Sequence, residues 1–278
     1  MGNKAEYGPI GVFDSGYGGL TILKEILKEL PGYDYIYLGD NARAPYGNRS
    51  FGLVYDFTLQ AVRHLFDSGC PLVILACNTA SAKALRSIQQ RDLPRIAPDR
   101  RVLGVIRPTV ERLGSITGTG NIGIFGTPGT ILSESYNLEI AKLYPEFTSV
   151  GHACPMWVPL VENGEAESEG ADFFVKKEID ALIAENGKID TIILGCTHYP
   201  LLLDKIKKYT PEGVTLLSQG EIVADSLKDY LRRHPEIEGK LAREGQVKYQ
   251  TTEQPEKFNK IATLFMQQPV DAERITLG

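Results

Sequence analysis

The chain has 278 residues, of which 42% are hydrophobic and 23% are charged, and its formal net charge is −5. These values are typical of a globular protein rather than a disordered one, and the length suits about two domains. The acidic balance provides no polybasic surface, so we expect neither nucleic acid nor an anionic membrane as the main partner.

The sequence also indicates the compartment. Residues 1–6 contain no apolar core of a secretory signal, and no apolar run approaches the ~20 residues of a membrane-spanning helix. The four cysteines (Cys70, Cys77, Cys154 and Cys196) form no C-x-x-C pair, which argues against a zinc site or a thioredoxin-like motif. We therefore expect a soluble cytoplasmic protein with reduced thiols and no bound metal.

Predicted strands and helices alternate through the first part of the chain. Apolar residues recur at helical spacing from Leu20 to Leu30, and Gly69 is placed to end a second helix. The predicted strands are 10–13, 35–38, 73–76 and 102–106, and the predicted helices are 20–30, 54–65 and 80–90. This alternation favours an α/β domain with a largely parallel sheet.

The pattern restarts near residue 122. Strands are predicted at 122–125, 192–195 and 214–217, and helices at 134–143, 173–184, 203–209 and 222–231. In the charged tail, 246–251 reads as an edge strand. We expect two pseudo-symmetric α/β domains with mostly parallel sheets and an active site in the cleft between them. The first domain would span 1–106 plus about 219–278, and the second 107–218, because chain termini often lie close together.

Two cysteines occupy equivalent places in this repeated plan. Cys77 follows the apolar run VILA, and Cys196 follows IILG. Each half also has an earlier strand that ends in small polar residues, at Asp14-Ser15 and at Gly126-Thr127. Two halves that face each other would place one thiol on each side of a cleft. Two opposed thiols are well suited to a proton exchange at a carbon stereocentre.

Polar residues follow several of these strands, where ligands bind in open α/β sheets. They are Asp14-Ser15, Asn78-Thr79, Thr127 and Thr197-His198. Taken singly, each is explained as well by a helix cap or a turn, and His198 alone is as well explained as a structural histidine. Their recurrence in a repeated plan favours a site.

The cysteines divide into two kinds. Cys70 and Cys154 read as inert buried side chains. Cys77 and Cys196 precede predicted helix starts, which lower a thiol pKa, and Asp14 and His198 offer an acid–base partner to each. The turn Gly16-Tyr17-Gly18-Gly19 lacks the third glycine and the lysine of nucleotide-binding loops, so we expect its N–H groups to face a substrate carboxylate.

At this point the sequence closely resembles the cofactor-independent glutamate racemases of the aspartate/glutamate racemase family. The resemblance covers roughly the first 220 residues, and its motifs are highly specific in combination. The matching blocks are IGVFDSG (10–16) with GGLT (18–21), YLGD (37–40) with PYG (45–47), ACNTAS (76–81), ACP (153–155) through PLVE (159–162), and LGCTHYPL (194–201).

The resemblance implies interconversion of L- and D-glutamate without a cofactor, with the D form used in peptidoglycan synthesis, and a homodimer. It implies Cys77 and Cys196 as the two acid–base catalysts, the first assisted by Asp14 and the second by His198 and Glu162. The residues implied to contact the amino acid are Asp14, Ser15, Tyr46, Gly47, Asn78, Thr79, Thr127, Thr130, Thr197 and His198.

Three positions depart from the family pattern. Arg107 replaces an expected glutamate, Asn41 replaces a threonine, and Ser218-Gln219-Gly220 stands where Asp-Ser-Ala is commoner. None of them removes a thiol or its partners. The alternatives are an aspartate racemase of the same superfamily, a cysteine hydrolase or amidotransferase, which leaves the second thiol unexplained, and a two-lobed amino-acid binding module without chemistry.

Overall fold

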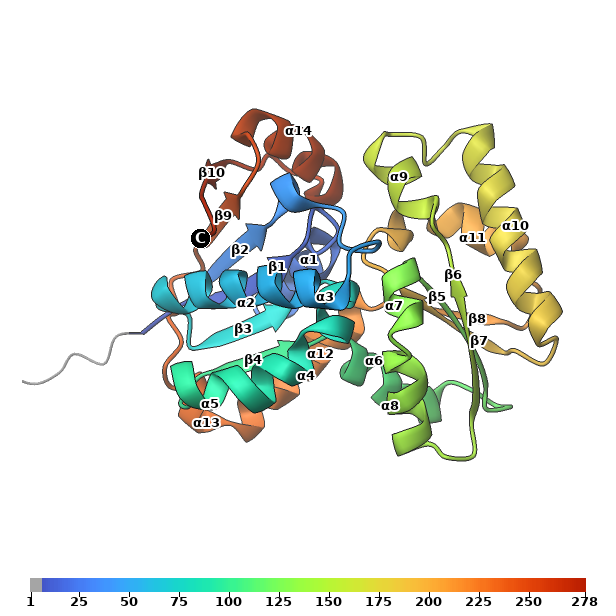
Figure 1. Ribbon diagram of the computed structural model, residues 1–278, viewed down its shortest axis with the longest axis horizontal. Coiled ribbons are helices and arrows are strands. Elements are labelled where there is room, and N and C mark those ends of the chain that lie inside the picture. The colour runs from blue at the N-terminus through green and yellow to red at the C-terminus, as the bar shows by residue number, and fades with distance from the viewer. Residues whose placement is uncertain (1–6) are drawn as a thin grey trace, which may run out of the picture.

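The computed structural model describes residues 7–278 as two α/β halves, each built on its own parallel sheet (Figure 1). Residues 1–6, where the sequence predicts no signal segment, lie outside the described residues. The first sheet has the order β10-β9-β2-β1-β3-β4, and the second has the order β6-β5-β7-β8. Every strand pairing is parallel, as predicted.

The strands of the first sheet come from both ends of the chain. They are β1 (Ile10–Asp14), β2 (Tyr35–Gly39), β3 (Leu72–Leu75), β4 (Arg101–Gly104), β9 (Val247–Thr251) and β10 (Ala272–Arg274). The second sheet contains β5 (Asn121–Gly126), β6 (Thr148–Ala153), β7 (Thr191–Gly195) and β8 (Thr215–Leu217). The central strands β1, β3 and β7 are buried along their whole length, because helices cover both faces of a parallel sheet.

The helices fall into two groups. Those of the first half are α1 (Leu20–Glu29), α2 (Phe51–Asp67), α3 (Asn78–Lys83), α4 (Leu85–Ser87), α5 (Leu93–Ile96), α12 (Gly220–Arg233), α13 (Pro235–Glu238) and α14 (Pro255–Met266). Those that follow the first crossing are α6 (Ile106–Glu111), α7 (Pro128–Leu132), α8 (Ser135–Leu143), α9 (Trp157–Glu162), α10 (Glu169–Glu185) and α11 (Leu203–Tyr209). Short 3₁₀ turns lie at Asn41–Arg43, Leu113–Ser115 and Tyr199–Leu202.

The chain crosses between the halves twice, from β4 through α6 to β5 and from β8 to α12, and α12 then packs against α1. We propose the domain division of the sequence analysis, 1–106 with about 219–278 and 107–218. The two sheets and the return of α12 support it.

Several predicted elements need correction. The helix expected over 80–90 is broken at Ala84 and continues through a π-helical turn, Ile88–Asp92, to Ile96. The strand expected over 102–106 ends at Gly104, because α6 starts at Ile106. The predicted edge strand β9 is internal, since it pairs with both β2 and β10. The elements β6, α6, α7, α9, α13, α14 and β10 were not expected from the sequence.

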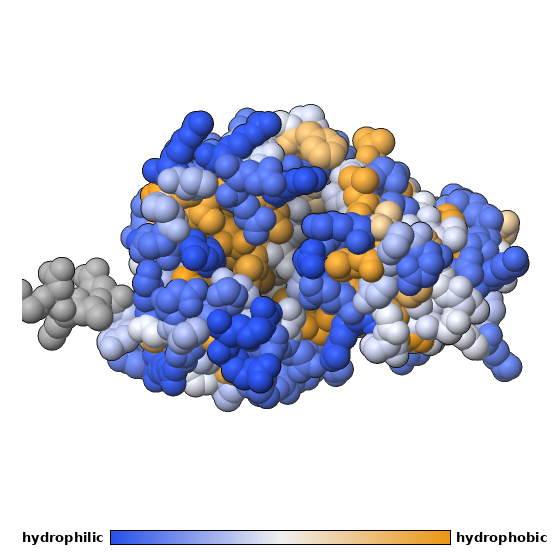
Figure 2. Space-filling view, turned by 90° about the horizontal axis from the view of Figure 1, so that it is seen from below, coloured by the Kyte–Doolittle hydropathy of each residue, from blue (hydrophilic) through white to orange (hydrophobic). Residues whose placement is uncertain are grey.

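The surface is largely hydrophilic on the face seen in Figure 2, with smaller hydrophobic areas among the polar residues. Some large apolar side chains are exposed, including Leu132 of α7 at 77% and Leu138 of α8 at 64%. Within residues 7–278, none of the helices combines the length and the apolar character needed to cross a bilayer.

Candidate active site

The ends of β1 and β3 bring the first thiol beside Asp14-Ser15. Phe13 pairs with Leu75 in the parallel register, so the segments after both strands leave the sheet at the same edge. Cys77 is the N-cap residue of α3, and its Sγ accepts the backbone N–H of Ala80 at 3.4 Å. The Ser15 hydroxyl lies 3.3 Å from the same Sγ. The sequence prediction that Cys77 precedes a helix is confirmed.

Burial outweighs the helix end in setting the acidity of this thiol. Cys77 is only 5% exposed. Burial, followed by the charge of Asp14, raises the pKa of Cys77 to about 12. The hydrogen bonds from Ala80 at the helix start and from Ser15 lower this pKa, as expected, but the loss of hydration on burial raises it by more. At neutral pH Cys77 is a thiol, and it needs a nearby base to become a thiolate.

Asp14 is the carboxyl group whose charge acts on Cys77. Its carboxylate is buried, with 1% exposure, and Oδ2 accepts the backbone N–H of Gly16 at 2.8 Å. Burial raises the pKa of Asp14 above its usual value, while His198 acts in the opposite direction. Asp14 interacts electrostatically with Cys77 as well as with His198. A buried carboxylate whose pKa is raised accepts protons more readily than an exposed one.

The second thiol, Cys196, lies at the end of β7 and contacts His198, which in turn contacts Glu162. His198 Nδ1 lies 3.9 Å from Cys196 Sγ, and His198 Nε2 lies 3.0 Å from Glu162 Oε1 at the end of α9. Cys196 does not stand at a helix start as predicted, since a turn separates it from the 3₁₀ helix Tyr199–Leu202. Its polar partner is the imidazole instead of backbone N–H groups.

Cys196 and Glu162 together set the charge of His198. Burial lowers the pKa of His198, but the hydrogen bonds to Cys196 and Glu162 and the charges of both groups outweigh it and raise the pKa to about 10. The imidazole is therefore protonated at neutral pH. Because this pKa exceeds the unfolded value of ~6.5, His198 stabilises the fold fully below about pH 6.5 and loses this contribution as the pH rises through 10.

Replacing Glu162 with glutamine should therefore move the alkaline side of the activity profile. Loss of the carboxylate charge lowers the His198 pKa, so turnover should begin to fall at a lower pH than in the parent protein. The pH dependence of kcat/KM measures this shift. Glu178→Gln is a matched control, because Glu178 also pairs with a histidine, His152 at 2.7 Å, and within residues 7–278 it forms no hydrogen bond to Cys77 or Cys196. Identical alkaline limbs in Glu162→Gln and the parent would contradict the role of Glu162.

The two halves touch through the first turn. The Thr21 hydroxyl donates to the Thr197 carbonyl at 3.1 Å. A Cβ atom added at Gly18 would lie 2.1 Å from Thr197 Oγ1 and 2.5 Å from His198 Nδ1. Only glycine allows this approach, so the turn packs directly against the loop that carries the second thiol. Whether its N–H groups face a substrate carboxylate, as predicted, stays a prediction.

A second contact joins the halves through threonine hydroxyls. Thr79 Oγ1 lies 3.0 Å from Thr127 Oγ1 and 3.3 Å from Thr130 Oγ1, and the latter two lie 3.1 Å apart. Gly129 donates its backbone N–H to the Gly47 carbonyl at 2.7 Å. The structure thus brings together, at the interface between the halves, predicted residues that follow β3, β5 and β2 in the chain.

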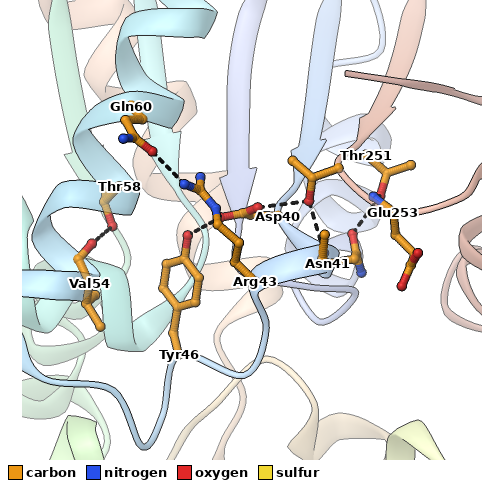
Figure 3. A network of polar contacts seen from close by, with 11 residues as sticks. Asp40, Asn41, Arg43, Tyr46, Val54, Thr58, Gln60, Thr251 and Glu253 are labelled. Carbon is orange, nitrogen blue, oxygen red and sulfur yellow. Dashed lines mark hydrogen bonds and ion pairs between the residues drawn. The ribbon is translucent and has the colours of Figure 1, made fainter. Parts of the chain in front are cut away.

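Tyr46 belongs to a buried network that anchors its loop (Figure 3). Its hydroxyl donates to Asp40 Oδ2, which also accepts from Arg43 Nε at 2.7 Å. The Thr252 hydroxyl donates to Asp40 Oδ1 at 2.8 Å, and Arg43 Nη1 donates to Gln60 at 2.5 Å. Asp40 is fully buried. The Tyr46 hydroxyl is therefore engaged within the protein, and the Tyr46 carbonyl accepts the backbone N–H of Arg49 at 3.0 Å.

Known proteins similar to this chain identify its family. Residues 10–227 match the Asp/Glu/Hydantoin racemase family. A glutamate racemase from Roseobacter denitrificans is 39% identical over 94% of this chain and 98% of its own length. This chain belongs to the Asp/Glu/Hydantoin racemase family. One from Streptococcus agalactiae is also 39% identical, over 97% of this chain and 98% of its own length.

Solved racemase structures share the whole fold. A glutamate racemase isoform from Bacillus anthracis superposes with a TM-score of 0.88 at 35% identity and covers 98% of both chains. A glutamate racemase from Francisella tularensis, solved in complex with D-glutamate, has a TM-score of 0.87 at 31% identity, again over 98% of both chains. The predicted fold class and family are confirmed.

Three of the residues that depart from the family pattern make side-chain hydrogen bonds. Arg107 of α6 donates to Glu111 at 2.8 Å and to Glu139 of α8 at 2.6 Å, so it joins two helices at the surface. Asn41 accepts a hydrogen bond from the Thr251 hydroxyl at 3.0 Å. Gln219 lies within hydrogen-bond distance of Asn78.

Sequence reasoning missed one side chain beside the second thiol. The Phe265 ring of α14 packs edge-on against His198, with ring centroids 5.7 Å apart. A cavity of about 620 Å³ beside Cys196 is lined by Phe265, Thr21 and Gln219, among others. The helical spacing of Phe258, Ala262 and Phe265 was the available signal for this racemase helix. Among residues 7–278, no cluster of His, Cys, Asp and Glu could hold a metal ion.

Proposed function

We propose that the protein interconverts L- and D-glutamate by a two-thiol, two-base proton transfer that needs no cofactor. The observation that carries the proposal is that each thiol has its own acid–base partners at the interface of the two halves. Cys77 has Ser15 and the charge of Asp14, and Cys196 has His198. The identity with glutamate racemases over nearly the whole chain supports the substrate.

The reaction requires these partners because the α-proton of an amino acid is weakly acidic. One thiolate removes the proton from one face of the α-carbon, and the opposite thiol donates a proton to the other face, so the configuration inverts. Asp14 takes up the Cys77 proton when Cys77 is the base. The protonated His198, held by Glu162 at 3.0 Å, stabilises the Cys196 thiolate.

The same proposal assigns the amino-acid contacts. Buried polar side chains from both halves would surround the substrate, and Tyr46 and Gly47 would contribute backbone groups. The proposed contact residues are Asp14, Ser15, Tyr46, Gly47, Asn78, Thr79, Thr127, Thr130, Thr197 and His198. The hydroxyl contacts among Thr79, Thr127 and Thr130 support this grouping.

The proposal extends to the use of the product and to the assembly of the protein. D-glutamate would supply peptidoglycan synthesis in the cytoplasm, where the four unpaired cysteines stay reduced. We also propose a homodimer, in which exposed apolar side chains such as Leu132 and Leu138 supply surface to bury.

Polarimetry of the purified protein with glutamate and with aspartate tests the proposed reaction. We expect L- and D-glutamate to racemise with no added cofactor and in the presence of a chelator. One methylene changes kcat/KM by about 10–200-fold in a fitted site, so aspartate should be slower by a factor in this range. Faster turnover of aspartate would favour the aspartate racemase alternative. Loss of activity with chelator, restored by a metal, would contradict the cofactor-independent mechanism.

A further inference from the structure

Gln219 closes a buried ring of hydrogen bonds with Asn78 and Tyr136. Asn78 Nδ2 donates to Gln219 Oε1 at 2.6 Å, Gln219 Nε2 donates to the Tyr136 hydroxyl at 2.8 Å, and that hydroxyl donates to Asn78 Oδ1 at 2.6 Å. All three side chains are 3% exposed or less. Gln219 Nε2 also lies 3.3 Å from Asn78 Oδ1, a longer contact across the ring.

A backbone carbonyl fixes the direction of this ring. The Thr109 hydroxyl donates to the Val105 carbonyl at 2.8 Å, since a carbonyl only accepts. Thr109 Oγ1 therefore acts as the acceptor for Gln219 Nε2, which lies 2.9 Å away. If the Gln219 amide were reversed, its oxygen would face an oxygen whose hydrogen is already engaged. The orientation of Gln219 then sets the orientation of Asn78 through Tyr136.

The ring leaves one N–H of Asn78 uncommitted. Its Nδ2 carries two hydrogens, and within residues 7–278 it donates only to Gln219. Asn78 directly follows Cys77 and begins α3. A fixed amide that offers an N–H beside the first thiol is suited to hold a carboxylate, whereas a reversed amide would offer a repelling oxygen.

Gln219 also joins both chain crossings between the halves. It lies at the return crossing, as the N-cap of α12, whereas Val105 and Thr109 lie at the outward crossing. Tyr136 comes from α8 of the second half. Serine, which is commoner at this position in the family pattern, has a shorter side chain without a carboxamide, so it cannot form this ring.

We propose that Gln219 is a positioning residue of this racemase, which orients the Asn78 amide so that its free N–H binds a carboxylate of the substrate. This inference rests on the proposed function. Gln219 acts through Asn78, so its effect on activity depends on the Asn78 side chain.

A double-mutant cycle tests the inference. Gln219→Ala should lower kcat/KM for glutamate by roughly 10–100-fold, mainly through a higher KM, because a carboxylate contact exists before and during the proton transfer. In an Asn78→Ala background the same change should lower kcat/KM by less than about twofold. Equal losses in both backgrounds, or no loss in the parent, would overturn the inference.

Further variants separate positioning from folding. Gln219→Glu keeps the shape of the side chain and an oxygen that accepts from Asn78, but it cannot donate to Tyr136. Tyr136→Phe removes the hydroxyl that donates to Asn78. Both variants should raise KM as Gln219→Ala does. An unchanged KM in either variant would contradict the claim that the ring orients the Asn78 amide. Gln250→Ala is the matched control, since Gln250 is also buried and hydrogen-bonded, to His64 and Glu273. It should leave KM unchanged. Racemisation of glutamate by the parent protein tests the proposed function, whereas the variants test only the role of Gln219.

Discussion

Replacing Cys77 or Cys196 with alanine is expected to abolish racemisation while the fold remains intact. Loss of a positioned acid or base typically costs about 10²–10⁴-fold, and more when the group is the only proton carrier on its face of the substrate. Cys77→Ala also removes the hydrogen bond accepted from Ala80, at a cost of about 1 kcal/mol, as for a lost N-cap. Polarimetry measures turnover, and thermal unfolding measures stability.

Cys70→Ala provides the matched control for both variants. Cys70 is fully buried, and burial raises its pKa to about 12, so it resembles Cys77 in environment. It lies at the start of β3, at the opposite end of this strand from Cys77. We expect this variant to retain turnover even if its melting temperature falls. Wild-type turnover in Cys77→Ala or Cys196→Ala would show that the two-thiol mechanism is wrong.

Replacing each cysteine with serine should separate the two faces of the reaction. From the family resemblance, we expect Cys77 to deprotonate D-glutamate and Cys196 to deprotonate L-glutamate. Substrates that lose a leaving group after α-proton removal, such as the enantiomers of N-hydroxyglutamate, need only one base. Cys77→Ser should therefore retain elimination from the L form and lose it from the D form, and Cys196→Ser should show the reverse. The rate of product release from each enantiomer measures this.

Steady-state racemisation cannot replace that measurement, because the equilibrium constant fixes the ratio of kcat/KM for the two directions. The asymmetry is expected because the thiols have different partners, a buried carboxyl group at Asp14 and a protonated imidazole at His198. Equal loss of elimination with both enantiomers in both variants would mean that the thiols act as one unit. The assignment of sides would then be wrong.

The sequence predicted the parts of the site that are local in the chain. Cys77 and Cys196 were predictable because each ends a buried apolar run, and parallel strands deliver their carboxyl ends to one edge. The succession of strands and helices in the first part of the chain followed from the alternation of apolar runs and helical periodicity. The broken helix after Cys77 was not predictable, since its interruption at Ala84 has no glycine or proline to mark it.

Features that depend on tertiary contacts could not be predicted from the sequence. The raised pKa of Cys77 comes from burial, which outweighs the local helix end. The Gln219 ring joins residues 141 positions apart in the chain. The Asp40 network depends on Thr252, which lies in the C-terminal tail. The sequence of this tail only weakly indicated the strand β9 that pairs with β2 in the first sheet. Such partners become visible only when separate segments pack together.

Proton NMR of L-glutamate incubated with the protein in D₂O tests the central claim most directly. A thiol that exchanges its proton with solvent returns deuterium to the α-carbon. The account therefore predicts that the α-proton signal disappears while the side-chain signals remain and D-glutamate accumulates, with no added cofactor. An α-proton signal that persists with no D-glutamate formed, under conditions in which the protein stays folded, would contradict it.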